Sequence, residues 1–317
     1  MKFNISKEWL LKGANLEKGL EIGAGGPIIS HAAASSLDWK RFPIKEMYKR
    51  NWFEGFAGSL TTALTEAEPL LTSFVERAMR RPAVALQRQK IRNGSQADKY
   101  ALLAWQCRVL LLAKTKPPKN EYKQSTLNAD WLSALAQLSR FNDGPIRAQK
   151  YLMEAGIIFV VEPHLPSTHL DGAALLSDNG PVIALTLRYD RLDNFWFVLF
   201  HEIIHVKKHL RKGSVEDIFD DLGTEGSPSV TEVDGIEQEA DALACESLIP
   251  AEIWKTAIAR FVRSEQSVKT LADKIKINPA IVAGRIQKET KNYAVLRTLI
   301  GQGEVRKLFP NVHFGRI

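Results

Sequence analysis

Residues 193–205, with the sequence DNFWFVLFHEIIH, constrain the fold more than any other segment of this 317-residue chain. Apolar residues occupy every side of the helix that this segment would form, so we expect a helix buried in a core rather than one on a surface. The same segment contains the pattern H-E-x-x-H, which brings ionisable groups into that core. A buried charge is costly unless a partner such as a cation compensates it.

Two histidines and a glutamate in this pattern form a candidate metal site. His201 and His205 are four residues apart, so they project from one helix face and can bind one zinc ion. Glu202 stands beside the first histidine, where its carboxylate can accept a proton from a water molecule that zinc activates. The pattern alone also fits a buried helix with two hydrogen-bonded core histidines and no metal. The charged Glu202 in an otherwise apolar helix favours the metal.

A catalytic zinc ion needs a third protein ligand. His209 continues the helical stripe, but it lies about 12 Å along the helix axis from His201, which is too far to share an ion. One class of zinc peptidases has its third histidine six residues after the second, and that position is Arg211 here. The third ligand must therefore come from another segment.

The acidic residues 237–241, EQEAD, offer that ligand on a predicted helix that Pro250 ends. We favour Glu239, at the edge of the buried face, over Glu237. Asp241 could then form a hydrogen bond to a ligating histidine from outside. The alternative for Glu237 and Glu239 is that both are ordinary exposed carboxylates.

The rest of the chain mixes helical and strand patterns. We expect helices at residues 5–13, 127–139 and 144–155, a helical pattern over 59–113, a strand at 157–162, and a hairpin with strands at 172–176 and 181–187. The hairpin turn contains Asn179-Gly180, a strong turn signal. These elements predict an α+β fold.

Charge is distributed unevenly along the chain. Residues 1–130 carry 21 basic and 12 acidic side chains, residues 131–250 carry 9 and 19, and residues 251–317 carry 13 and 5. The basic N- and C-terminal regions could contact nucleic acid through its phosphates, although a solvated basic helix face is the commoner explanation. One group of basic residues could contact nucleic acid or an acidic partner, although a basic helix face is again the commoner explanation: Arg80, Arg81, Arg88, Lys90 and Arg92.

Residues 267–288 have the spacing of two helices joined by a tight turn, as in a helix-turn-helix. Lys276 stands where the turn usually has glycine. We favour a helical hairpin packed on the core over a DNA-reading unit.

Two features point to a cytoplasmic protein without a membrane partner. The sequence has only two cysteines, which does not suit a disulfide scaffold. We find neither a signal peptide at the N-terminus nor an apolar run of the ~18 residues that cross a bilayer.

The segment from about 130 to 250 resembles the ImmA/IrrE family of prokaryotic zinc metallopeptidases. The residues that carry the resemblance are Leu135–Ser139, Gly156–Val161, Leu170-Asp171-Gly172, Pro181–Phe200 with the H-E-x-x-H, and the E-x-E-A-D…L-I-P block. The resemblance implies that His201, His205 and Glu239 bind zinc, with manganese as an alternative, and that Glu202 is the general base. Residues 1–40 depart from many relatives because they are too short for a complete repressor-type helix-turn-helix.

The resemblance also implies an architecture and a function. We expect an irregular N-terminal segment (1–45), a helical region (46–118), a zincin-like peptidase core (119–250) and a basic helical C-terminal region (251–317). Relatives act in stress, phage or toxin–antitoxin settings, and some cleave a helix-turn-helix repressor. The expected function is a zinc-dependent endopeptidase acting on such a partner protein. The alternative is an antitoxin-like or DNA-associated regulator that uses the peptidase fold for binding.

Overall fold

The computed structural model describes residues 37–79, 98–210 and 230–314. Its helices are α3 (Ile44–Lys49), α4 (Leu60–Thr65), α5 (Ala67–Ala78), α6 (Lys99–Lys114), α7 (Ala129–Gln137), α8 (Gly144–Glu154), α9 (Leu192–Ile204), α10 (Val230–Leu248), α11 (Ala251–Thr256), α12 (Ile258–Phe261), α13 (Glu265–Ile275) and α14 (Pro279–Thr290). The strands are β1 (Ile158–Val161), β2 (Gly172–Ser177) and β3 (Gly180–Leu185). These elements confirm the expected α+β fold. The helix predicted at 5–13 and the basic group from Arg80 to Arg92 lie outside the described residues.

A small sheet forms the centre of the fold. Its strand order is β1-β3-β2, with β1 parallel and β2 antiparallel to β3. The predicted hairpin forms with its turn at Gly180, whose φ of +116° suits a residue without a side chain. β2 is therefore at one edge of the sheet, and the structure shows no strand among the described residues on its outer side.

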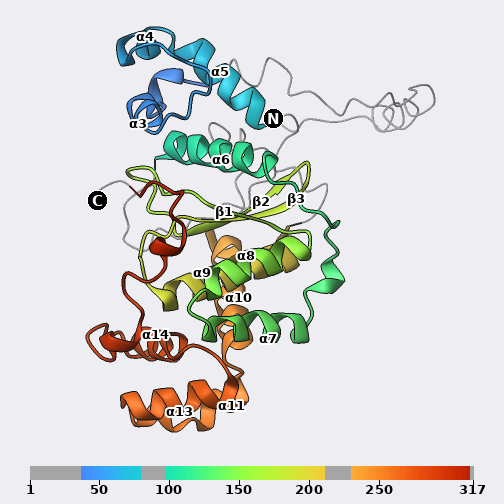
Figure 1. Ribbon diagram of the computed structural model, residues 1–317, viewed down its shortest axis with the longest axis vertical. Helices are drawn as coiled ribbons and strands as arrows, with labels where there is room; N and C mark the ends of the chain where they lie inside the picture. The colour runs from blue at the N-terminus through green and yellow to red at the C-terminus, as the bar shows by residue number, and fades with distance from the viewer. Residues whose placement is uncertain (1–36, 80–97, 211–229, 315–317) are drawn as a thin grey trace, which may run out of the picture.

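Helices cover both faces of the sheet (Figure 1). Side chains that alternate along β1 and β3 enter two separate apolar cores, because neighbouring strand residues point to opposite faces. Ile158 and Val182 face α6, on which α5 packs in turn, and Phe159 and Ile183 face α8 and α9 on the other side. The domain boundary expected near residue 118 stays a prediction, although α6 packs directly on the sheet.

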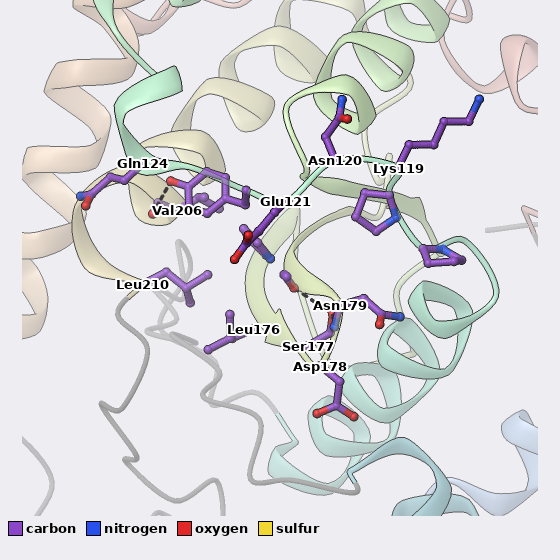
Figure 2. Close-up of a pocket in the computed structure, with 15 residues that line it drawn as sticks. Lys119, Asn120, Glu121, Gln124, Leu176, Ser177, Asp178, Asn179, Val206 and Leu210 are labelled. Atoms are coloured by element: carbon purple, nitrogen blue, oxygen red, sulfur yellow. Dashed lines mark hydrogen bonds between the residues drawn. The ribbon is translucent and has the colours of Figure 1, made fainter. Parts of the chain in front are cut away.

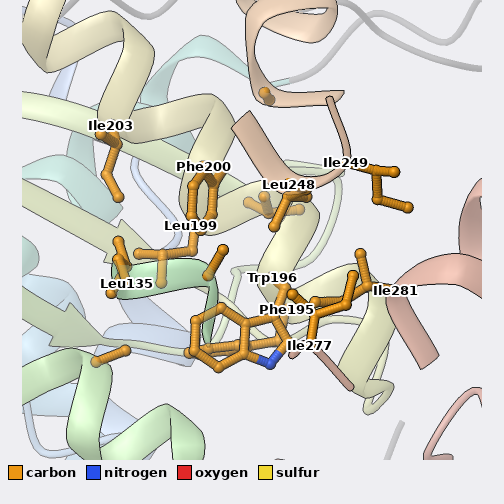
Figure 3. Packing of buried hydrophobic residues seen from close by; sticks show 14 of the residues in the cluster. Leu135, Phe195, Trp196, Leu199, Phe200, Ile203, Leu248, Ile249, Ile277 and Ile281 are labelled. Carbon is orange, nitrogen blue, oxygen red and sulfur yellow. The ribbon is translucent and has the colours of Figure 1, made fainter. Parts of the chain in front are cut away.

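Helix α9 lies in the core as its sequence predicts. Phe195, Trp196, Leu199, Phe200 and Ile203 are buried almost completely. They pack against side chains from α7, α10, α14 and the turn between α13 and α14, as Figure 3 shows for Leu135, Leu248, Ile281 and Ile277. The helix is thus held from several sides, which fixes the direction of the polar groups that it carries.

The predicted C-terminal hairpin consists of α13 and α14, and it packs against α9 and the core around it rather than standing apart. Asn278 caps α14, and Lys276 adopts the left-handed conformation at the turn where glycine was expected. Arg191 joins this hairpin to the start of α9, because its guanidinium donates to Asp193 and to Gln287 of α14. No helix in the described part of the chain is both long and apolar enough to cross a membrane.

The contact between α14 and α9 can be tested at Gly284. A methyl group there would lie 2.6 Å from Asp193 Cβ, so Gly284→Ala must force the helices apart. We expect it to lower the free energy of unfolding by about 1–3 kcal/mol, the usual range for overpacking. Chemical denaturation of the full chain measures the change.

Gly235→Ala in α10 is the matched control, because no atom lies within 4 Å of the added methyl group. It should leave stability unchanged or raise it by about 0.5–1 kcal/mol. Equal effects of the two substitutions would contradict the proposed tight contact.

Candidate metal centre

The last turn of α9 and the residue that follows it bring two imidazoles together. His201 and His205 lie one turn apart on the same face, as predicted, and their Nε2 atoms are 3.0 Å from each other. His205 is buried and His201 nearly so. The apolar side chains on the other faces of α9 anchor the helix in the core. Both rings are therefore placed by packing.

Glu237 of α10 completes the cluster. Its Oε2 lies 3.2 Å from His201 Nε2, and its Oε1 lies 3.4 Å from His205 Nε2. Ligand atoms of these three residues all lie within 4.8 Å of one another. Within the described residues, this is the group of histidine and carboxylate side chains that could hold a metal ion.

Glu239, the residue that we favoured, lies elsewhere. Its carboxylate accepts hydrogen bonds from Lys208 at 3.1 Å and from His209 at 3.2 Å, and 44% of the side chain is exposed. Residues two apart on an α-helix point about 200° apart, so α10 cannot direct both glutamates at the histidines. The structure therefore brings Glu237, rather than Glu239, to the two imidazoles.

The sequence contains a signal for the burial of Glu237. The buried residues Ala240, Ala244 and Leu248 of α10 follow Glu237 at helical spacing, so Glu237 lies in line with the face that packs on α9. The acidic residues around Glu237 make this segment look exposed in the sequence, so its burial is difficult to predict.

Asp241 holds His201 from its other side, as predicted. Its Oδ1 lies 3.0 Å from His201 Nδ1, and its Oδ2 accepts from Lys288 Nζ at 3.1 Å. Lys288 also lies 3.9 Å from the ring centre of Phe197. A carboxylate behind a ligating imidazole fixes the orientation and the tautomer of the ring.

The charges of the cluster favour a cation between its side chains. Burial by itself would lower the pKa of His201, but the hydrogen bonds to Asp241 and Glu237 outweigh it and raise that pKa to about 10. Burial would raise the pKa of Glu237, yet both histidines stabilise its ionised form and lower the pKa to about 2. The carboxylates thus stabilise a positive charge next to the imidazole rings. Either a proton or a divalent metal ion can supply that charge.

The donor set also fits such an ion. Two imidazole nitrogens and one carboxylate form the ligand set of one type of catalytic zinc site, which leaves a further coordination position open. Each of these donors is at least partly buried. The side chains of His201, His205 and Glu237 therefore suit a divalent metal, although they do not settle its identity.

Glu202 lies beside the cluster in an apolar environment. Burial raises the pKa of its carboxyl, and the neighbouring His201 and His205 oppose that rise. The carboxylate faces the start of β2: a methyl group on Gly172 would lie 3.0 Å from Glu202 Oε1. The absence of a side chain at Gly172 gives this carboxylate room at the edge of the sheet.

A groove opens at the far end of β2 (Figure 2). It has a volume of about 710 Å³ and lies between the chain from Pro117 to Gln124, the hairpin tip from Leu176 to Pro181, and the residues Val206 and Leu210 that follow the histidines. The groove is lined by both polar and apolar side chains. Val206 and Leu210 connect it to the segment that carries His205, whereas none of the three candidate ligands lines it.

One family model matches part of the chain. Residues 155–287 match the model of a peptidase family described as the IrrE N-terminal-like domain. This stretch of the chain is similar to the IrrE N-terminal-like domain. This finding confirms the resemblance drawn from the sequence, and the matched residues include α9, most of α14 and the three candidate ligands. No curated protein and no solved structure was found to match the chain.

The third candidate ligand, Glu237, can be tested by substitution. We expect Glu237→Ala to lower zinc affinity by more than the roughly 10- to 100-fold that loss of an outer hydrogen-bond partner costs, because it removes a donor atom. Glu239→Ala should cost much less. Competition with a fluorescent chelator measures both affinities. A larger loss in Glu239→Ala would restore the original assignment.

Proposed function

We propose that the protein is a zinc-dependent endopeptidase that hydrolyses a peptide bond in a partner protein. The observation that carries this proposal is the convergence of His201, His205 and Glu237 beside the buried carboxylate of Glu202. The peptidase family match supports the reaction class. The bound ion would polarise the peptide carbonyl and make a water molecule more acidic.

Glu202 supplies the proton transfers. Its carboxylate accepts a proton from the attacking water and then delivers that proton to the nitrogen of the leaving amine, so it returns to its starting state. Burial raises its pKa, which makes the carboxylate a stronger base than an exposed glutamate. Asp241 and the packing of α9 hold the neighbouring His201 ring in place during these steps.

The edge strand β2 offers a place for an extended substrate. Gly172, at its start, lies against Glu202, and its outer side has no partner strand among the described residues. An extended peptide can add to such an edge through backbone hydrogen bonds. At roughly 3.3 Å per residue, the strand spans about five residues between Glu202 and the groove at Ser177. The groove would then receive substrate side chains distant from the bond that is cleaved.

The partner that we propose is a helix-turn-helix repressor or a toxin–antitoxin component, in a stress or phage setting. This part of the proposal rests on the resemblance to the ImmA/IrrE family. A peptidase that adds its substrate as a strand requires the cleaved segment to be extended, so we expect cleavage in a linker or an unfolded segment of the partner.

The second candidate function, DNA-associated binding without catalysis, would use the hairpin α13–α14. One face of α14 is buried against the peptidase core through Ile281, Val282 and Ile286. On its other side, Arg285 and Lys288 pair with Glu289 and Asp241. These contacts leave α14 few groups for a DNA groove, so they favour the enzyme.

Glu202→Gln separates catalysis from binding. The amide cannot accept the proton of water, so we expect cleavage to fall by about 10²- to 10⁴-fold while zinc remains bound. Cleavage is measured on a proteome-derived peptide library, with new N-termini identified by mass spectrometry. Glu252→Gln is the matched control, because this glutamate is 87% exposed and lies outside the site. Cleavage by Glu202→Gln at the rate of the unmodified protein would rule out the proposed role.

A further inference from the structure

Each of the two histidines has a hydrogen-bond partner on the side of its ring that faces away from Glu237. The partner of His201 is the carboxylate of Asp241. The partner of His205 is a third histidine: His205 Nδ1 lies 3.0 Å from His209 Nδ1, and the two ring centres are 5.1 Å apart. His209 is not one of the candidate ligands.

The helix changes its geometry where His209 stands. Residues His205–His209 form a π-helix, η4, in which the amide of Leu210 donates to the carbonyl of His205 at 2.9 Å. Such widened turns are uncommon and often occur at functional sites. Here the Nδ1 atoms of His205 and His209 approach each other within this widened turn.

His209 also has a partner at its far end. Its Nε2 lies 3.2 Å from Glu239 Oε2, and the other oxygen of Glu239 accepts from Lys208 at 3.1 Å. The His209 side chain is only 10% exposed, whereas Glu239 is at the surface. The contacts thus run from the buried His205 through His209 to a surface carboxylate.

Only one arrangement of protons satisfies these contacts when His205 binds a metal. The Nε2 of His205 must keep its lone pair for the ion, so its Nδ1 carries the proton and donates to His209. The Nδ1 of His209 must then accept, which places the proton of that ring on Nε2. A carboxylate can only accept, and Glu239 lies where this proton points.

We propose that His209 and Glu239 are positioning residues that fix the orientation and tautomer of His205 for metal binding. This inference rests on the proposed metal centre. It assigns a role to Glu239, which lies on the wrong face of α10 to be a ligand but on the right face to meet His209. The two ligating histidines then have parallel supports, each ending in a carboxylate that a lysine holds: Asp241 with Lys288, and Glu239 with Lys208.

Two substitutions of His209 test the role in the full chain. His209→Phe keeps a ring of similar size but removes both nitrogens, so we expect zinc affinity to fall by about 10- to 100-fold. His209→Asn keeps an acceptor near the position of Nδ1, so we expect a loss of less than about tenfold. Chelator competition with zinc measures both values, and circular dichroism confirms that each variant is folded.

Nitrogen-15 spectra of the zinc-loaded protein, labelled at histidine, provide an independent measurement. We expect His209 to be the tautomer with its proton on Nε2, and His205 to carry its proton on Nδ1. A merely structural role for His209 would not require either tautomer. A proton on His209 Nδ1 would overturn the proposal.

Controls separate failure of this inference from failure of the metal centre. His313→Leu, at an exposed histidine outside the site, should bind zinc as the unmodified protein does. Zinc retained by His201→Ala would refute the metal centre itself. If His201→Ala loses zinc but His209→Phe does not, only the positioning role fails. Equal losses of zinc affinity in His209→Phe and His209→Asn would also overturn the positioning role. The same holds if the protein binds a second zinc ion and His209→Phe loses only that ion.

Discussion

The burial of ionisable groups on one apolar helix is the constraint on which the rest of the structure depends. Taking a charge out of water costs several kcal/mol, and α9 carries Glu202, His201 and His205 into a core. Its buried aromatic and aliphatic side chains each stabilise the fold by about 1.5–3 kcal/mol, so packing on the sheet, α10 and α14 can offset that cost. The carboxylates of Glu237 and Asp241 then balance the charge of the imidazoles.

Much of this arrangement follows from local sequence patterns. The unbroken apolar character of residues 193–205 predicted the buried helix, four-residue spacing predicted the paired imidazoles, and Asn179-Gly180 predicted the hairpin that places β2 beside them. These features depend on periodicity and on turn chemistry, which neighbouring residues determine. The same is true of α8, which begins near Pro145 and ends before Gly156, a residue with a φ of +79°.

The carboxylate that meets the two imidazoles could not be assigned in this way, because its identity depends on how one helix is rotated against another. Glu237 and Glu239 have the same chemistry and differ only by about 200° of helix phase. Tertiary packing of Ala240 and Ala244 on α9 sets that phase. The packing of α6 on the sheet also depends on residues far apart in the sequence. The indole N–H of Trp105 in α6 donates to the backbone carbonyl of Glu162, 57 residues away.

The C-terminal hairpin belongs to the support of the site rather than to a separate unit. Arg191, at the start of α9, donates a hydrogen bond to Gln287 of α14. Lys288 of α14 donates to the carboxylate of Asp241, which contacts His201. Gly284 allows this approach, because any larger residue would collide with Asp193. A partner that moved α14 would therefore disturb the outer contacts of His201 before it reached the ligands themselves. Part of the basic charge of this region therefore has a structural role, because Lys288 and Arg285 form ion pairs with Asp241 and Glu289.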